Sequence, residues 1–253
     1  GVANMSTLTS VHRGDIKMQR SGINIVRGTD YTPVFDSQQI DLRNGLTPSQ
    51  RTQLKAKSVL MSGQDTITVS PVALPGINIL AAGSGADIYN LTGGTLGHWG
   101  LALILDDVIS FDVSAGAVGD AIIDSLVPQD TLNLSKIGKD LYFTIFSLSS
   151  NDIEALDDFV STKGVGIDFP LSLGTTVVMA SQFDPLDNGE PPQVSNILTN
   201  IVSQLGKANI ALAIGVENIV GGTKNNTFNF YDGAKLGGRI SAGYGGNVAL
   251  NYQ

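Results

Sequence analysis

The chain has 253 residues, 15 Lys and Arg against 23 Asp and Glu, a formal net charge of −8, and no cysteine. A chain of this length can bury a substantial core, and the lack of cysteine excludes disulfide bonds and thiolate chemistry. Hydrophobic residues make up 42% and charged residues 15% of the sequence, a composition that excludes intrinsic disorder. Because no apolar run reaches the ~18 residues of a membrane-spanning helix, no transmembrane segment is predicted.

Charge is distributed unevenly along the chain. Residues 1–60 hold eight Lys and Arg against four Asp, a net of +4, and residues 61–253 hold seven against nineteen acids, a net of −12. This asymmetry predicts a basic N-terminal arm (1–60) beside an acidic globular body (61–253). We expect Arg13, Lys17, Arg20 and Arg27 to contact either another copy or, weakly and non-specifically, nucleic acid. An ordinary solvated segment is the simpler interpretation, since these charges are spread thinly.

The N-terminal portion is expected to be β-rich beyond residue 60. Residues 11–28 have no sustained period, and a short helix is predicted from Thr47 to about Ser58, because Thr47 can cap it and Pro48 suits its first turn. Residues 66–70 alternate and residues 77–80 are apolar, as in strands. The pattern Gly-Ile-Asn-Ile occurs at both 22–25 and 76–79. Two copies do not make a repeat array, so we interpret them as a coincidence.

Strands and helices alternate between about residues 98 and 220. Strands are predicted over 101–105, 108–113, 141–148, 175–180 and 210–216, and helices over 115–127, 150–161 and 194–205. Strands that are apolar throughout are typical of a sheet covered on both faces. The predicted fold class is therefore α/β or α+β, with a mixed sheet and covering helices over 98–220.

The C-terminal β tail (226–253) differs in character. Its segments 226–231, 236–242 and 248–252 alternate polar and apolar residues, and glycine-containing pairs separate them. This pattern predicts a β-meander with tight turns. An exposed terminal strand is a template for pairing with another chain.

One loop could hold a metal ion. Asp184, Asp187 and Glu190 surround a Pro and a Gly, and the hard cations Ca²⁺ and Mg²⁺ prefer oxygen ligands on sharply turned loops. The spacing departs from the EF-hand pattern, and a solvated acidic loop is the alternative. Other acids follow predicted strands, where ligands bind in α/β sheets: Asp106, Asp107, Asp112, Asp152 and Glu217.

Residues for catalysis are scarce. The only histidines are His12 and His98, and no Gly-x-Ser-x-Gly elbow accompanies either of them. We interpret His98 as a residue packed at the start of a strand. Two histidines without cysteine do not make a closed zinc site, and no motif identifies a family.

These observations favour a non-enzymatic structural protein that self-assembles, as a virion coat or tail component or a cell-surface filament subunit. The expected partners are copies of the chain itself, and the expected location is a virion or an extracellular surface. One alternative is a carboxylate-dependent hydrolase acting on glycans or esters. A second alternative is a secreted lipid-binding or pore-forming protein.

Overall fold

The described part of the chain forms two β-sheets, the complete helix α4 (Ser150–Thr162) and part of a further helix at residues 194–198. The computed structural model describes residues 2–4, 13–18, 22–27, 64–71, 76–82, 86–93, 100–106, 129–162, 174–183, 193–195, 198, 209–231 and 233–252. We refer to these as the described residues.

Sheet A is the larger of the two sheets. Its nine described strands follow the spatial order β1 (Val2–Asn4), β3 (Gly22–Arg27), β5 (Gly76–Ala81), β7 (Gly100–Leu105), β11 (Ile210–Ile214), β10 (Thr176–Ser181), β9 (Leu141–Ser147), β13 (Asn225–Phe230) and β15 (Asn247–Tyr252). Only β10 is antiparallel to its neighbours, and the other adjacent strands described in this sheet pair in parallel.

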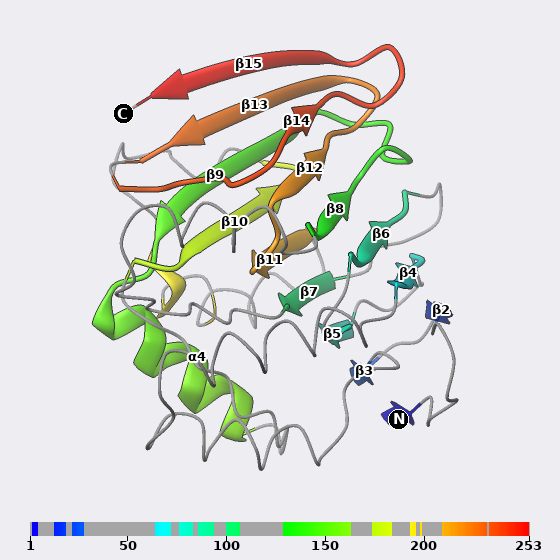
Figure 1. Ribbon diagram of the computed structural model, residues 1–253, viewed down its shortest axis with the longest axis vertical. Coiled ribbons are helices and arrows are strands. Elements are labelled where there is room, and N and C mark those ends of the chain that lie inside the picture. Colours follow the sequence, from blue (N-terminus) through cyan, green and yellow to red (C-terminus); the bar gives the residue numbers. More distant parts are fainter. Residues whose placement is uncertain are drawn as a thin grey trace, which may run out of the picture.

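Sheet B is parallel throughout. Its six described strands follow the order β14 (Ile240–Ser241), β12 (Asn218–Val220), β8 (Thr131–Asn133), β6 (Ile88–Leu91), β4 (Gln64–Val69) and β2 (Arg13–Met18). From β1 to β8 the chain alternates between the two sheets, so successive turns of a coil stack on one another (Figure 1). The hairpin-like strands β9 and β10, with α4 between them, interrupt this coil before β11 resumes it.

Parallel stacking places like residues on like. The two copies of Gly-Ile-Asn-Ile lie on β3 and β5, where Gly22 pairs with Gly76 and Asn24 with Asn78. Our interpretation of this repetition as a coincidence was therefore wrong. Polar side chains stack in the same way on sheet B, where the Asn133 amide donates to the Asn90 side-chain oxygen at 2.8 Å.

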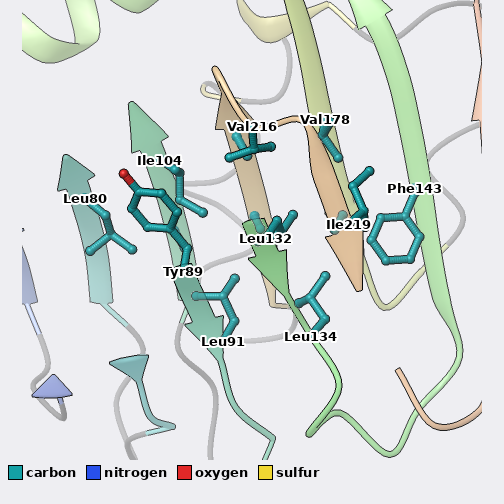
Figure 2. Packing of buried hydrophobic residues seen from close by; sticks show 14 of the residues in the cluster. Leu80, Tyr89, Leu91, Ile104, Leu132, Leu134, Phe143, Val178, Val216 and Ile219 are labelled. Atoms are coloured by element: carbon teal, nitrogen blue, oxygen red, sulfur yellow. The ribbon is translucent and has the colours of Figure 1, made fainter. Parts of the chain in front are cut away.

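Two apolar clusters hold the layers together. The inner cluster fills the space between the sheets with side chains such as Leu80 and Ile104 from sheet A and Tyr89 and Leu132 from sheet B (Figure 2). The outer cluster lies on the opposite face of sheet A and contains Leu156 of α4. Strands β5, β7 and β11 are buried along their whole length because both faces of sheet A are covered there.

Helix α4 confirms the helix predicted over 150–161, and Ser149 caps it. The Ser149 hydroxyl accepts a hydrogen bond from the Asp152 backbone N–H at 3.3 Å, and the Asp152 carboxylate accepts one from the Ser149 backbone N–H at 3.0 Å. This is a reciprocal cap at the helix N-terminus. The other oxygen of Asp152 accepts the Val194 backbone N–H at 2.7 Å. Asp152 is therefore a buried structural residue that joins α4 to the next segment.

The structure corrects three expectations. Residues 13–18 and 22–27, predicted to be aperiodic, form β2 and β3, which pair with β4 and β5 of the predicted body. The C-terminal segments do not form a meander, since β13 and β15 run parallel. They can do so because the chain crosses to sheet B between them to form β14.

Covering helices are barely present among the described residues. Helix α4 is complete and 193–198 is described in part, whereas the helices predicted over 47–58 and 115–127 lie outside the described residues.

No described helix combines the length and the apolar character needed to cross a membrane.

The first prediction concerns the tight stacking of β7 on β5. Gly100 has φ +80, and a Cβ there would collide with the carbonyl oxygen of Gly76, whereas Gly174 has φ +84 with nothing within 4 Å of its Cβ position. Gly174→Ala should cost only the left-handed backbone penalty, about 1–2 kcal/mol. Gly100→Ala should cost about 1–3 kcal/mol more, because the strands must separate. Urea unfolding of both variants measures the difference, and equal losses would show that β5 and β7 do not approach this closely.

Candidate functional site

The structure does not describe the predicted metal loop. Asp184, Asp187 and Glu190 lie outside the described residues, and so do Arg20, Asp107, Asp112 and both histidines. Arg13 and Lys17 lie on β2 in sheet B, whereas Arg27 lies on β3 in sheet A. The metal and nucleic-acid roles of these residues therefore stay predictions.

A column of four acidic residues crosses sheet B. We call Asp65, Asp87, Asp130 and Glu217 the acid ladder. Asp65 lies at the start of β4, and the other three lie directly before β6, β8 and β12. The parallel register of these strands puts the four residues at one level of successive turns. In the same register Gly14 lies beside Asp65 at the N-terminal end of the ladder.

Each carboxylate of the ladder beyond Asp65 bonds to the backbone of the preceding turn. The Asp65 N–H donates to Asp87 Oδ1 at 2.6 Å, the Asp87 N–H to Asp130 Oδ1 at 2.7 Å, and the Asp130 N–H to Glu217 Oε2 at 2.8 Å. Hydrogen bonds from N–H groups to carboxylates are stronger than neutral ones. The ladder therefore joins each turn of the coil to the next one through a hydrogen bond between neighbouring acidic residues.

Asp106 joins the ladder from sheet A. It directly follows β7, its backbone N–H donates to the Ile214 carbonyl at 3.0 Å, and its carboxylate bonds to the Tyr89 hydroxyl. Carboxylate oxygens of Asp87, Asp106 and Asp130 all lie within 4.8 Å of one another. We call these three residues the aspartate cluster. They are 1%, 1% and 5% exposed, so the cluster lies inside the protein.

Burial dominates the electrostatics of this region. It raises the pKa of the Asp130 carboxyl well above its ordinary value, and the neighbouring Asp106 carboxylate raises it further. Burial also raises the pKa of Glu217 to about 7, although hydrogen bonds from the backbone oppose the shift. The Tyr89 pKa is raised by burial and then by Asp106. Asp130 and Glu217 thus retain protons at a pH where exposed carboxyls are ionised.

The aspartate cluster could hold a hard cation such as Ca²⁺ or Mg²⁺, because it offers carboxylate oxygens from the ends of three successive strands, β6, β7 and β8. It is not suited to glycan or ester hydrolysis, since a substrate cannot contact side chains that are at most 5% exposed. Its role in the described fold is to join turns of the coil.

The sequence contains a signal for the ladder that the prediction of separate elements missed. Each acid of the ladder is followed by an apolar residue two positions later and, in three of the four segments, by another apolar residue four positions later. The segments are Asp-Thr-Ile-Thr-Val at 65–69, Asp-Ile-Tyr-Asn-Leu at 87–91, Asp-Thr-Leu-Asn-Leu at 130–134 and Glu-Asn-Ile-Val at 217–220. Of the strand-end acids named from the sequence, Asp106 and Glu217 belong to this region, but Asp87 and Asp130 were not predicted. Their irregular spacing of 22, 43 and 87 residues hides the repetition.

The second notable feature is the terminal strand β15, which is exposed along its whole length. Its side chains Val248, Leu250 and Tyr252 are 44%, 49% and 77% exposed. They lie on the face of sheet A that elsewhere forms the inner cluster, since Leu250 pairs with Phe228, and Phe228 stacks on Phe143 at 4.2 Å. Tyr252 stacks on Phe230 at 5.3 Å. The apolar face of the sheet thus continues to its last strand and ends exposed.

The opposite face of β15 carries an amide ladder. The Asn247 amide donates to the Asn225 side-chain oxygen at 3.1 Å, and the Asn251 amide donates to the Asn229 side-chain oxygen at 2.8 Å. Asn247, Ala249 and Asn251 thus share this face of β15 and pair with Asn225, Thr227 and Asn229 of β13.

The backbone of β15 is paired on one side within the described residues. The Asn247 N–H donates to the Lys224 carbonyl at 3.0 Å, so the polar backbone groups of 247, 249 and 251 face β13. Those of Val248, Leu250 and Tyr252 face the other side, where no described strand lies. An edge of this kind, flat and flanked by apolar side chains, is a template for strand addition.

The chain matches no protein-family model, no curated protein and no solved structure.

The raised pKa of Glu217 leads to a pH prediction. A carboxyl whose folded-state pKa lies above its unfolded value binds more protons when folded, so stability falls as pH rises between the two values. For Glu217 this window extends from its ordinary 4.5 to about 7, and the loss across it is at most roughly 3 kcal/mol. Glu217→Gln keeps an acceptor for the Asp130 N–H and should flatten this part of the profile. Urea unfolding at pH 5, 6, 7 and 8 measures it, and parallel profiles for both proteins would contradict the assignment.

The ladder hydrogen bonds lead to a separate prediction. Asp87→Ala removes the acceptor of the buried Asp65 N–H and should destabilise the fold by about 1–3 kcal/mol. Asp87→Asn keeps an oxygen acceptor and should cost clearly less. Thermal unfolding of both variants at pH 5, below the pKa of about 7 of Glu217, compares them. Equal losses would mean that this hydrogen bond contributes little.

Proposed function

We propose that this protein is a non-enzymatic structural subunit that assembles with copies of itself through the open edge of β15. A virion coat or tail component and a cell-surface filament subunit are the classes that fit, with a virion or an extracellular surface as the location. The observation that carries the proposal is strand β15, which is exposed throughout and has no described strand on the side that the backbone groups of Val248, Leu250 and Tyr252 face.

The chemistry of this edge supports assembly in two ways. An added strand would satisfy backbone groups of Val248, Leu250 and Tyr252, and each hydrogen bond contributes about 0.5–1.5 kcal/mol. It would also cover Val248, Leu250 and Tyr252, which are large exposed apolar side chains. Tyr244, which precedes β15 in the chain, is 98% exposed. Burial of apolar area contributes about 25 cal/mol per Å².

Val194 and Leu198, from the helix predicted over 194–205, pack in the outer cluster. The basic arm (1–60), its nucleic-acid contact and the Ca²⁺ or Mg²⁺ loop remain predictions that assembly does not require. The hydrolase and lipid-binding alternatives gain no observation from the described residues.

A proline substitution tests the proposal at one backbone group. Leu250→Pro removes an outward N–H while leaving the hydrogen bonds to β13 in place, and edge strands tolerate proline at such positions. It should weaken assembly by at least about tenfold, which corresponds to ~1.4 kcal/mol. Leu250→Val keeps the N–H and an apolar side chain and serves as the matched control. Size-exclusion chromatography with light scattering over a range of concentrations measures assembly.

Circular dichroism and urea unfolding check that both variants fold as the unsubstituted protein does. A strict monomer at high concentration, in every variant and at every salt concentration, would refute the proposal. Equal assembly of the proline variant and the valine control would show that β15 is not the assembling edge.

A further inference from the structure

Building on the proposed function, we infer that the partner copy stacks head-to-tail, with its strand β1 pairing in parallel with β15. The chain then extends sheet A from copy to copy and forms an open filament. The inference depends on the directions of the strands, on which faces they share and on the two ends of the sheet.

The two end strands of sheet A run in the same direction. Strands β1, β3, β5, β7 and β11 are parallel, β10 reverses the direction, and β9 restores it. Strands β13 and β15 then continue parallel to β9. A copy moved along the stacking direction without being turned over therefore brings its β1 beside β15 in parallel. A two-fold dimer would instead pair β15 with the β15 of its partner in an antiparallel arrangement. Among the described strands of sheet A, antiparallel pairing occurs only between β10 and its two neighbours.

The two ends of the sheet lie at opposite ends of the stack (Figure 1), with the N-terminal strands at one end and β15 at the other. A contact between two different surfaces is heterologous, and it propagates without closing unless a rotation brings it back. Among the described strands, the contact joins the two end strands of sheet A.

The face of each residue limits the possible registers. When paired residues are followed from strand to strand across sheet A, Val2 is aligned with Ile79, which belongs to the outer cluster. The same alignment continues to Asn251 on β15. Registers that keep the two faces of the sheet therefore place Val2 opposite Asn247, Ala249 or Asn251. We select Val2 opposite Ala249, because all of β1 is then paired and Asn4 lies opposite Asn251. This register continues the amide ladder of Asn229 and Asn251 into the next copy.

Disulfide trapping tests the inference, because the chain contains no cysteine of its own. Residues directly opposite on neighbouring strands lie about 5 Å apart at Cα, within the range of a disulfide bond. Val2→Cys protein is mixed with Ala249→Cys protein at a concentration where the unsubstituted protein assembles, and it is oxidised under mild conditions. We expect a covalent dimer of one copy of each. Ala3→Cys mixed with Ala249→Cys is the matched control, and it should give none because the two positions lie on opposite faces.

Single variants distinguish the alternatives. Val248→Cys, Ala249→Cys and Leu250→Cys are each oxidised alone, and a covalent homodimer from any of them would indicate two-fold pairing of β15. That result would overturn the head-to-tail inference while leaving self-assembly intact. Assembled protein that gives no Val2–Ala249 crosslink would overturn it as well, and a strict monomer would refute both this inference and the proposed function. Filaments should also have neighbouring strands spaced ~4.8 Å apart along their axis, across the junctions as well as within each copy.

Discussion

In-register stacking of parallel strands is the constraint on which the rest of the structure depends. It places each residue directly over its counterpart in the neighbouring turn, so that Gly22 lies on Gly76 and Asp87 on Asp130. Glycines allow backbones to approach at one level, and acids meet acids at another. The same constraint aligns β15 with β13, residue on residue, and no described strand lies beyond β15. The acid ladder and the exposed edge are thus two results of one geometry.

The acid ladder shows how the coil tolerates like charges in its core. Burial and mutual repulsion raise the pKa of Asp130 and favour its protonated form. Hydrogen bonds from backbone N–H groups, such as that from Asp87 to Asp130, favour its charged form. These effects oppose each other at Asp130, where burial and the Asp106 carboxylate influence the pKa more than the hydrogen bond does. The stability of the coil and the ionisation of its core are therefore coupled.

Local patterns predicted individual elements well and the architecture poorly. Helix α4 and strands such as β9 and β11 agree with predictions made from apolar runs and capping residues. The alternation of strands between two sheets was not predicted, because strand partners such as Ile16 and Ile67 are separated by long and unequal segments. Asp87 and Asp130 were missed for the same reason, since only the register brings them together. The parallel pairing of β13 with β15 depends on the crossing to β14, which glycine-rich turns do not reveal.

Residue-resolved amide hydrogen exchange on β15 tests the central claim most directly. In dilute protein the amides of Ala249 and Asn251, which face β13, should exchange slowly, and those of Leu250 and Tyr252 should exchange rapidly. At concentrations where copies assemble, the amide of Leu250 should become protected while protection at Ala249 and Asn251 is maintained. Slow exchange at Leu250 in dilute monomer would mean that the edge is already covered. Rapid exchange there in fully assembled protein would mean that copies meet elsewhere.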